Sequence, residues 1–302
     1  MKVYYADHFV LPLPAGHRFP MIKYARLRER VAAELPGAVL TVPDAATDAE
    51  LFRAHDAAYV QRVVTGTLSP AEVRRIGFPW SADMVERSRR SVGATLAASR
   101  AALDEGISVN LAGGTHHAYP DRGEGFCVFN DVGVAVRAVQ AEAPVRRGAV
   151  IDCDVHQGNG TAAILSEDPS TFTFSVHGEG NFPFRKESSD LDIALPDGAG
   201  DDAYLSAVEA GLAAAARHAP ELVWYLAGAD AWEGDRLGRL RVSKGALARR
   251  DRLVLDACGD MGAAVAVVMA GGYAADPEDT VDIHFQSVRA AYGHWLARRT
   301  SL

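Results

Sequence analysis

The sequence predicts a single α/β domain built on a parallel β-sheet of about eight strands, with helices on both faces. Short, β-branched apolar runs alternate with longer amphipathic runs along the 302 residues. Runs such as AVIDC (149–153) and AVVMA (266–270) have no polar alternation, which is typical of strands that are covered on both faces. No repeat, low-complexity tract or long linker divides the chain, so we expect one domain over residues 1–302.

The predicted elements alternate in β-α-β order. The apolar runs that predict strands are Lys2–Ala6, Ala38–Val42, Ile107–Ala112, Gly148–Cys153, Thr171–Val176, Leu191–Leu195, Leu222–Ala227 and Val265–Ala270. Helical spacing, often with Asp or Ser near the start as a cap, predicts helices over Met21–Leu35, Asp83–Glu105, Val132–Glu142, Asp201–Ala216, Lys244–Cys258 and Thr280–Arg298. Leu11–Pro20 and Gly178–Asp190 are rich in Gly, Pro and polar residues and are predicted loops.

The composition excludes several classes of protein. With 31 Lys+Arg against 39 Asp+Glu, the net charge of −8 argues against a general nucleic-acid binder and allows cationic substrates. The start, MKVYYADHFV, does not resemble a signal peptide, and no segment has the roughly 18 apolar residues of a spanning helix. Three widely spaced cysteines, Cys127, Cys153 and Cys258, are typical of a reducing compartment. We therefore expect a cytoplasmic protein without nucleic-acid or membrane partners.

Polar residues follow four of the predicted strands. AGGTHHA follows Ile107–Leu111, DCDVHQGNGT follows Gly148–Ile151, AGADAWEGD follows Leu222–Leu226, and AGGY follows Val265–Met269. Ligands of open α/β sheets bind beyond the carboxyl ends of the strands, so these segments should meet at one edge. The residues expected there resemble a metal site: His116, His117, Asp152, Asp154, His156, Asp230 and Tyr273.

Asp154 and His156 alternate along an extended segment, which places both side chains on the same side. With Asp230 they would give three protein ligands and an open position, the arrangement of catalytic zinc. Nitrogen and oxygen ligands without thiolate also suit iron(II). The same pattern fits carboxylates that cap strand ends and a histidine that packs in the core.

The tandem histidines His116 and His117 offer a base and an electrostatic partner, with Asp152 and Asn159 positioned to orient their far nitrogens. Tyr273, after two glycines, could donate its hydroxyl to an oxyanion, or could be a packed loop tyrosine. The aromatic loops Gly123–Phe129 and Asn181–Phe184 could wall a narrow channel or fold back onto the core.

In this order, HRFPMIKY, GGTHHAYPDRGEGFCVFND, IDCDVHQGNGT, SVHGEGNFPF, AGADAWEGDRLGRL and AGGY resemble the zinc-dependent histone deacetylase superfamily across nearly the whole chain. HRFPMIKY, RSRRSVGAT (87–95) and GDRLGRL (234–240) make the chain most similar to the branch of class IV deacetylases and their bacterial relatives. The resemblance implies the arginase-deacetylase fold, with a central eight-stranded parallel sheet between helices.

The resemblance also implies roles for residues. Zinc ligands fall on Asp154, His156 and Asp230, the active-site histidines on His116 and His117, the orienting carboxylate on Asp152, and the transition-state tyrosine on Tyr273. Asn159 replaces a second aspartate found in many class I members, so a neutral partner should lower the pKa of His117. The acyl-lysine tunnel falls on Gly125, Phe126, Phe182 and Leu237, and a structural potassium site on Asp152, Asp154, His156, Ser175 and Val176.

The function implied is removal of acetyl or longer fatty acyl groups from N-ε-acyl-lysine in a protein or peptide by a zinc-activated water. Two alternatives stay open. One is hydrolysis of acetylpolyamines or other small acylated amines, and the other is an acyl-binding module without catalysis. Retention of both histidines, the tyrosine and all three ligand residues argues against the second alternative.

Overall fold

Eight parallel strands form one sheet in the computed structural model, which describes residues 1–142 and 145–300. Their spatial order is β2-β1-β3-β8-β7-β4-β5-β6, and every neighbouring pair is parallel. The strands are β1 (Lys2–Tyr4), β2 (Val39–Thr41), β3 (Ile107–Asn110), β4 (Gly148–Asp152), β5 (Thr171–Gly178), β6 (Leu191–Leu195), β7 (Leu222–Leu226) and β8 (Ala264–Val268). The predicted sheet is confirmed, and every strand end lies within two residues of its predicted position.

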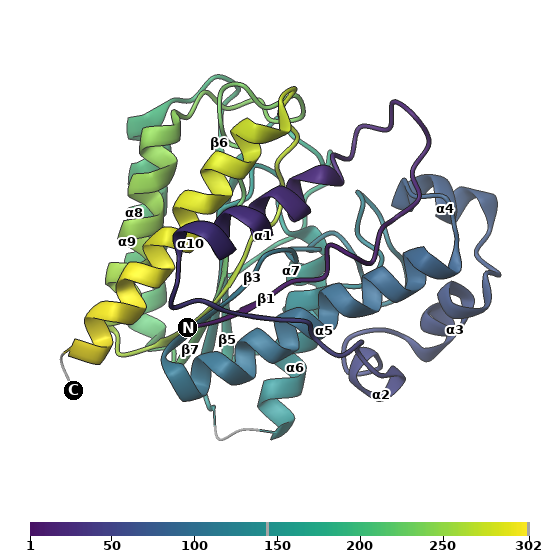
Figure 1. Cartoon of the computed structure of the whole chain (residues 1–302), viewed down its shortest axis with the longest axis horizontal. Helices are drawn as coiled ribbons and strands as arrows, with labels where there is room; N and C mark the ends of the chain where they lie inside the picture. The colour runs from purple at the N-terminus through teal and green to yellow at the C-terminus, as the bar shows by residue number, and fades with distance from the viewer. Residues whose placement is uncertain (143–144, 301–302) are drawn as a thin grey trace.

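Helices cover both faces of this sheet, as predicted (Figure 1). One face packs against α1 (Ile22–Glu34), α8 (Asp201–His218), α9 (Lys244–Asp260) and α10 (Pro277–Thr300). The other face packs against α5 (Ala82–Glu105), α6 (Asp131–Glu142) and α7 (Asn159–Leu165), and the short helices α2 (Asp48–Leu51), α3 (Ala57–Thr65) and α4 (Pro70–Ile76) extend this layer.

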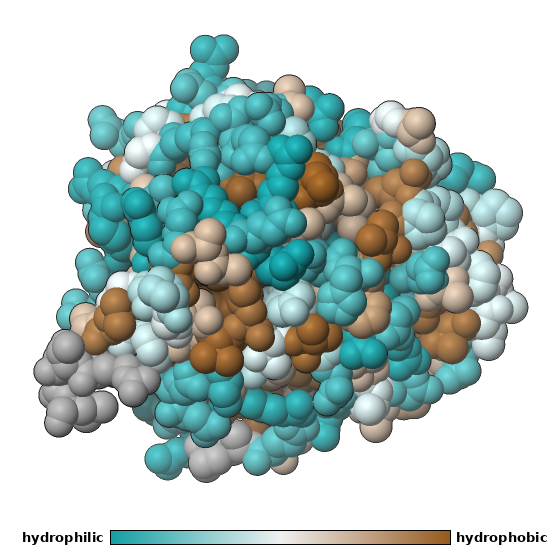
Figure 2. Space-filling view, viewed as in Figure 1, coloured by the Kyte–Doolittle hydropathy of each residue, from teal (hydrophilic) through white to brown (hydrophobic). Residues whose placement is uncertain are grey.

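The core consists of two layers because successive strand residues point to opposite faces. Val223 and Tyr225 of β7 pack into the layer with α8 to α10, whereas Trp224 and Leu226 pack into the layer with α5 and α6. On the face seen in Figure 2, hydrophobic residues lie in separate patches among hydrophilic ones. No helix among the described residues is long and apolar enough to cross a membrane.

Four short helices, α2, α3, α4 and α7, were not predicted, because none is longer than nine residues and a pattern of two turns or so is hard to distinguish from a loop. The signals for two of them are local. Thr47 and Glu50 form a reciprocal capping box at the start of α2, and Ser69 and Glu72 form another at the start of α4. The six longer predicted helices are all present.

The fold brings the four polar segments to one edge. In the sheet, β3, β8, β7 and β4 are consecutive neighbours, so the residues after their carboxyl ends converge. Those residues include His116 and His117 after β3, Tyr273 after β8, Asp230 after β7, and Asp154 and His156 after β4.

Candidate metal centre and active site

Asp154, His156 and Asp230 form a compact, buried group in which one possible ligand atom from each residue lies within 4.8 Å of the others. Nδ1 of His156 lies 3.0 Å from Oδ1 of Asp154 and 3.2 Å from Oδ2 of Asp230. Asp154 and Asp230 are at most 1% exposed, and His156 is 8% exposed. The two carboxylates therefore face one imidazole nitrogen with almost no access to water.

These residues fit a bound cation. Oδ2 of Asp230 is buried without a hydrogen-bond partner among the described residues, and such an atom is costly unless a positive group neutralises it. Burial lowers the pKa of His156, but the adjacent Asp154 and Asp230 raise it to about 10. The two carboxylates therefore favour a positive charge between them. A divalent ion would supply that charge and use the imidazole and carboxylate atoms as ligands.

Backbone amides hold the remaining carboxylate oxygens in place. Oδ2 of Asp154 accepts a 2.7 Å hydrogen bond from the Gly271 amide, and Oδ1 of Asp230 accepts a 3.0 Å bond from the Val155 amide. The Asp154 amide donates in turn to Oδ1 of Asp152 at 3.1 Å. The ligand side chains are thus oriented by an outer layer of hydrogen bonds, as in preorganised metal sites.

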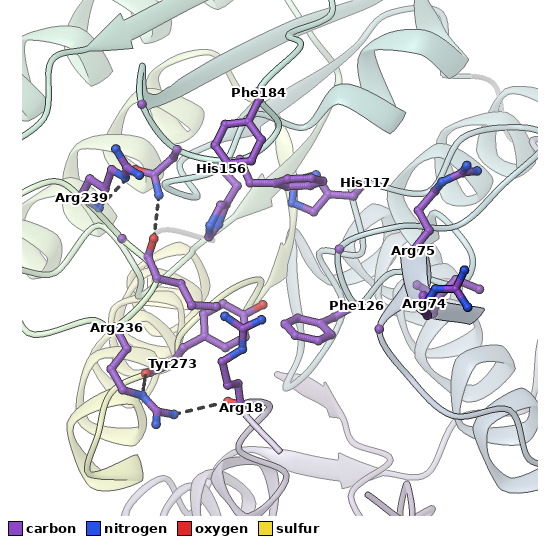
Figure 3. A pocket seen from close by; sticks show the side chains of 18 residues that line it. Arg18, Arg74, Arg75, His117, Phe126, His156, Phe184, Arg236, Arg239 and Tyr273 are labelled. Carbon is purple, nitrogen blue, oxygen red and sulfur yellow. Dashed lines mark hydrogen bonds between the residues drawn. The ribbon is translucent and has the colours of Figure 1, made fainter. Parts of the chain in front are cut away.

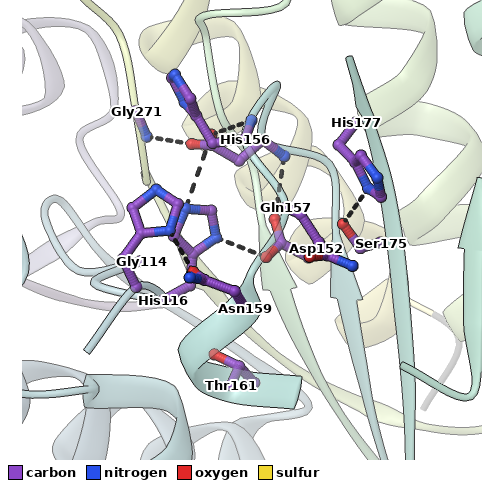
Figure 4. A network of polar contacts seen from close by, with 12 residues as sticks. Gly114, His116, Asp152, His156, Gln157, Asn159, Thr161, Ser175, His177 and Gly271 are labelled. Atoms are coloured by element: carbon purple, nitrogen blue, oxygen red, sulfur yellow. Dashed lines mark hydrogen bonds and ion pairs between the residues drawn. The ribbon is translucent and has the colours of Figure 1, made fainter. Parts of the chain in front are cut away.

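Two histidines stand beside this group with different partners, and Figure 4 shows the first of them, His116, with its partner Asp152. Nδ1 of His116 lies 2.6 Å from Oδ2 of Asp152, and Nδ1 of His117 lies 2.7 Å from Oδ1 of Asn159. Both rings are less than 5% exposed, and their centroids are 4.2 Å apart. In each pair the oxygen accepts from Nδ1–H, so Nε2 of each ring is left for chemistry in the cavity.

The surroundings give the two imidazoles different charge states. Burial lowers the pKa of His116, but Asp152 and Asp154 raise it to about 9. Burial, together with His116 and His156, lowers the pKa of His117 well below its ordinary value of 6.5. At neutral pH, His116 is therefore an imidazolium and His117 a neutral imidazole that can accept a proton.

Glu124 is a site residue that the sequence did not single out. The Asn159 amide nitrogen donates to Oε1 of Glu124 at 2.7 Å and to the Tyr119 hydroxyl at 3.2 Å, and that hydroxyl donates to Glu187 at 3.0 Å. A carboxylate at Nδ2 fixes the amide with Oδ1 toward His117. Glu124 lies only two residues from Phe126. Its contact with Asn159 cannot be seen in the sequence, because only the tertiary fold brings these two residues together.

The loop of Tyr273 is tied down on several sides. Asp235 accepts from the Tyr273 amide at 2.6 Å, and Nε of Arg236 donates to the Tyr273 carbonyl at 2.8 Å. Nζ of Lys23 donates to the Gly272 carbonyl at 3.1 Å. Burial raises the pKa of the Tyr273 phenol well above 10, so the hydroxyl remains protonated and can donate.

A cavity of about 560 Å³ leads from the surface to these residues (Figure 3). His117, His156 and Tyr273 lie along its lining, and the four predicted tunnel residues line it as well: Gly125, Phe126, Phe182 and Leu237. Gly125 has φ of +56°, and a methyl group there would lie 2.7 Å from the His117 ring and 3.0 Å from Phe182. A side chain at this position would therefore obstruct the wall beside the histidine.

The predicted potassium site stays a prediction. Ser175 lies opposite Asp152 in the register of β4 and β5, and Val176 follows it. The hydroxyl of Ser175 lies 3.0 Å from Nδ1 of His177. The three cysteines are buried and free, and the Asp-His-Asp group contains none of them.

Fold and site together define an α/β protein with a candidate metallohydrolase centre at the carboxyl edge of its sheet. Residues 17–286 match the histone deacetylase domain family, and the chain belongs to that family. The resemblance seen in the sequence motifs is confirmed, and the fold agrees with it. Membership makes the protein an enzyme of the deacetylase class of hydrolases.

Relatives match most of the chain. An uncharacterized protein of Picosynechococcus sp. is 44% identical over 292 residues, covering 96% of this chain and 97% of its own length. The histone deacetylase-like amidohydrolase of Pseudomonas aeruginosa is 33% identical over 283 residues, covering 87% of this chain and 74% of its own. The crystal structure of an HDAC homologue from Aquifex aeolicus aligns with a TM-score of 0.81 at 21% identity, over 96% of this chain and 83% of that one, which establishes the shared fold.

Proposed function

We propose that this protein hydrolyses the amide of N-ε-acyl-lysine in a protein or peptide, using a zinc-activated water, with Fe²⁺ as the alternative metal. The observation that carries the proposal is the convergence of a buried Asp-His-Asp group, one charged and one neutral histidine, and a protonated tyrosine beside one cavity. A cavity with phenylalanines in its wall suits an extended acyl-lysine side chain. The relative from Pseudomonas aeruginosa carries the name of an amidohydrolase.

Asp154, His156 and Asp230 would hold the metal. When bound, such an ion supplies a Lewis acid that polarises the substrate carbonyl and lowers the pKa of a bound water toward neutrality. Oδ2 of Asp230 is buried without a hydrogen-bond partner among the described residues, so it is the oxygen of the group that a cation would best neutralise.

His117, His116 and Tyr273 would transfer the proton and stabilise the charge that develops during hydrolysis. His117, neutral at pH 7, takes the proton from the attacking water and later gives it to the leaving amine. Its hydrogen bond to Asn159 keeps Nδ1 protonated, so the free Nε2 is the atom that exchanges the proton. His116, held charged by Asp152, stabilises negative charge as it develops, and the Tyr273 hydroxyl donates to the carbonyl oxygen.

The mouth of the cavity argues against polyamines, the small-molecule alternative. Acetylated polyamines carry positive charges beyond the amide, and five arginines line this cavity. Like charges at that position would oppose binding. The length of the acyl chain, the likeness to class IV deacetylases and a cytoplasmic location stay predictions.

The direct test is Tyr273→Phe with Tyr292→Phe as the matched control, since Tyr292 lies on α10 and its hydroxyl accepts from the Gly37 amide. Removing an oxyanion donor should lower kcat on acetyl-lysine peptide by about 10²–10³-fold. Metal content should stay at the wild-type level, and the control should keep full activity. Wild-type kcat in Tyr273→Phe would refute the role of the tyrosine. Rates on acetyl-, octanoyl- and myristoyl-lysine peptides and on acetylputrescine would set the substrate.

A further inference from the structure

The mouth of the catalytic cavity is positively charged, although the whole chain has a net charge of −8. Among the described residues that line the cavity, none is Asp or Glu. Five are arginines: Arg18, Arg74, Arg75, Arg236 and Arg239. All five are exposed, so their charge is presented to solvent rather than buried in the fold.

These arginines come from three separate segments of the chain. Arg18 lies in the loop between β1 and α1, Arg74 and Arg75 lie in the last turn of α4, and the other two follow β7. In Figure 3, Arg239 and the Arg74–Arg75 pair stand on opposite sides, with His156 and His117 between them. The positive charge therefore borders the opening on more than one side.

Most of this charge has no acidic partner in the part of the chain that the structure describes. Arg239 pairs with Asp197 at 3.1 Å, whereas the guanidinium of Arg236 donates to the carbonyls of Tyr273 and Arg18. For Arg18, Arg74 and Arg75, no carboxylate of residues 1–142 or 145–300 lies within ion-pair distance. Uncompensated like charges repel one another, so this cluster favours the approach of anions.

We propose that the substrate is an acyl-lysine carried on an acidic peptide segment, with carboxylates on both sides of the lysine. This inference rests on the proposed amide hydrolysis and names its substrate class. Guanidinium groups bind carboxylates in a planar, two-point geometry, and arginines on opposite sides of the opening match carboxylates on both sides of an inserted lysine. Phe184, 84% exposed at the same cavity, offers apolar contact to such a segment, which a small anion would not use.

The net charge of the whole chain, −8, gives no indication of a substrate with negative charge. The excess of acidic residues allows cationic substrates, but the charge that bears on the substrate is the charge at the opening. The five arginines come from three short segments that lie far apart in the sequence. Only the fold brings them to one place.

The first experiment compares acetyl-lysine peptides of one length, with glutamate, glutamine or arginine on both sides of the lysine. We expect kcat/KM about tenfold higher for the glutamate peptide than for the glutamine peptide at low salt, from two exposed charge contacts. The preference should shrink in 0.5 M NaCl, where screening acts over about 4 Å. Affinities of the same peptides, labelled and measured by fluorescence anisotropy, should follow the same order without any turnover.

The second experiment removes the charge. Arg74→Gln/Arg75→Gln should remove most of the preference for the glutamate peptide over the glutamine peptide, measured both as kcat/KM and as affinity. The matched control is Arg217→Gln/Arg252→Gln, which removes two exposed charges from α8 and α9, away from the cavity lining, and should keep the preference.

The outcomes separate this inference from the proposed function. Equal binding and equal kcat/KM for the glutamate and glutamine peptides would overturn the inference, and so would a preference that survives the loss of Arg74 and Arg75. If no peptide is hydrolysed but the glutamate peptide still binds more tightly, amide hydrolysis fails and the cationic, anion-binding surface stands. If N-acetyl-4-aminobutyrate, a small anionic amide, is hydrolysed as fast as the glutamate peptide, the substrate is not a peptide.

Discussion

The metal centre should depend on the absence of a side chain at Gly271. Its amide donates to Oδ2 of Asp154, and its carbonyl accepts from the Ala229 amide at 2.8 Å, so the backbone lies against both ligand-bearing loops. A methyl group added here would lie 1.9 Å from Oδ2 of Asp230 and 2.6 Å from Oδ2 of Asp154. Those two oxygens belong to the residues that would bind the metal, so Gly271→Ala acts directly on the ligand set.

The expected loss of metal affinity in Gly271→Ala follows from these distances. A Cβ atom essentially never lies within 3.0 Å of a non-bonded heavy atom. The Asp230 oxygen, at 1.9 Å, must therefore move by more than 1 Å. Metal–ligand distances tolerate only about 0.2 Å, and even outer-layer changes cost about 10–100-fold in metal affinity. We therefore expect Gly271→Ala to weaken metal binding by at least about 100-fold, with parallel loss of kcat/KM.

The assay is metal titration of the stripped protein, with content by elemental analysis and fold by circular dichroism. Gly293→Ala is the matched control, because it lies on the exposed side of α10 and an added methyl meets nothing within 4 Å. That change should stabilise the helix by about 0.8–1.0 kcal/mol and leave metal binding intact. A folded Gly271→Ala protein with wild-type metal affinity would refute the assignment of the ligand oxygens.

The remaining predictions concern the histidine partner and a buried ion pair. Asn159→Asp should raise the pKa of His117, because a charged acceptor favours the imidazolium, and so move the acidic limb of the kcat/KM–pH profile to higher pH. The shift should be larger in Asn159→Asp/Glu124→Gln, since Glu124 would otherwise face the new carboxylate; equal shifts in both variants would contradict the contact with Glu124. Arg250→Met leaves the buried Asp251 without its 2.8 Å partner and should cost about 3–5 kcal/mol in urea unfolding, and a loss below about 1 kcal/mol would be inconsistent with a buried pair.

Much of the fold could be predicted from the sequence, because the signals are long and repeated. Strands such as β4 and β7 are uniformly apolar, and long helices such as α5 carry many turns of the same spacing. The strand order could not be worked out from the residues alone, because it depends on which strands pair across the sheet. The short helix α4 rests on one capping box, a signal too local to separate from a turn.

The centre of the site was predictable and its surroundings were not. Asp154, His156 and Asp230 directly follow strand ends, so the topology of an α/β sheet alone suggests that they meet. Glu124 and the five arginines at the cavity mouth are different, because only the fold brings them beside the site. Long polar side chains on loops give no periodic signal, and their partners are set by tertiary packing.

The most direct test of the central claim is the rate of acetyl-lysine peptide hydrolysis by protein stripped of metal with a chelator and then titrated with Zn²⁺, and separately with Fe²⁺. If Asp154, His156 and Asp230 form a single catalytic metal site, activity should be absent at first, rise in proportion to added ion and saturate at one ion per chain. Full activity in protein without detectable metal, or no activity on any acyl-lysine peptide at saturation, would contradict it.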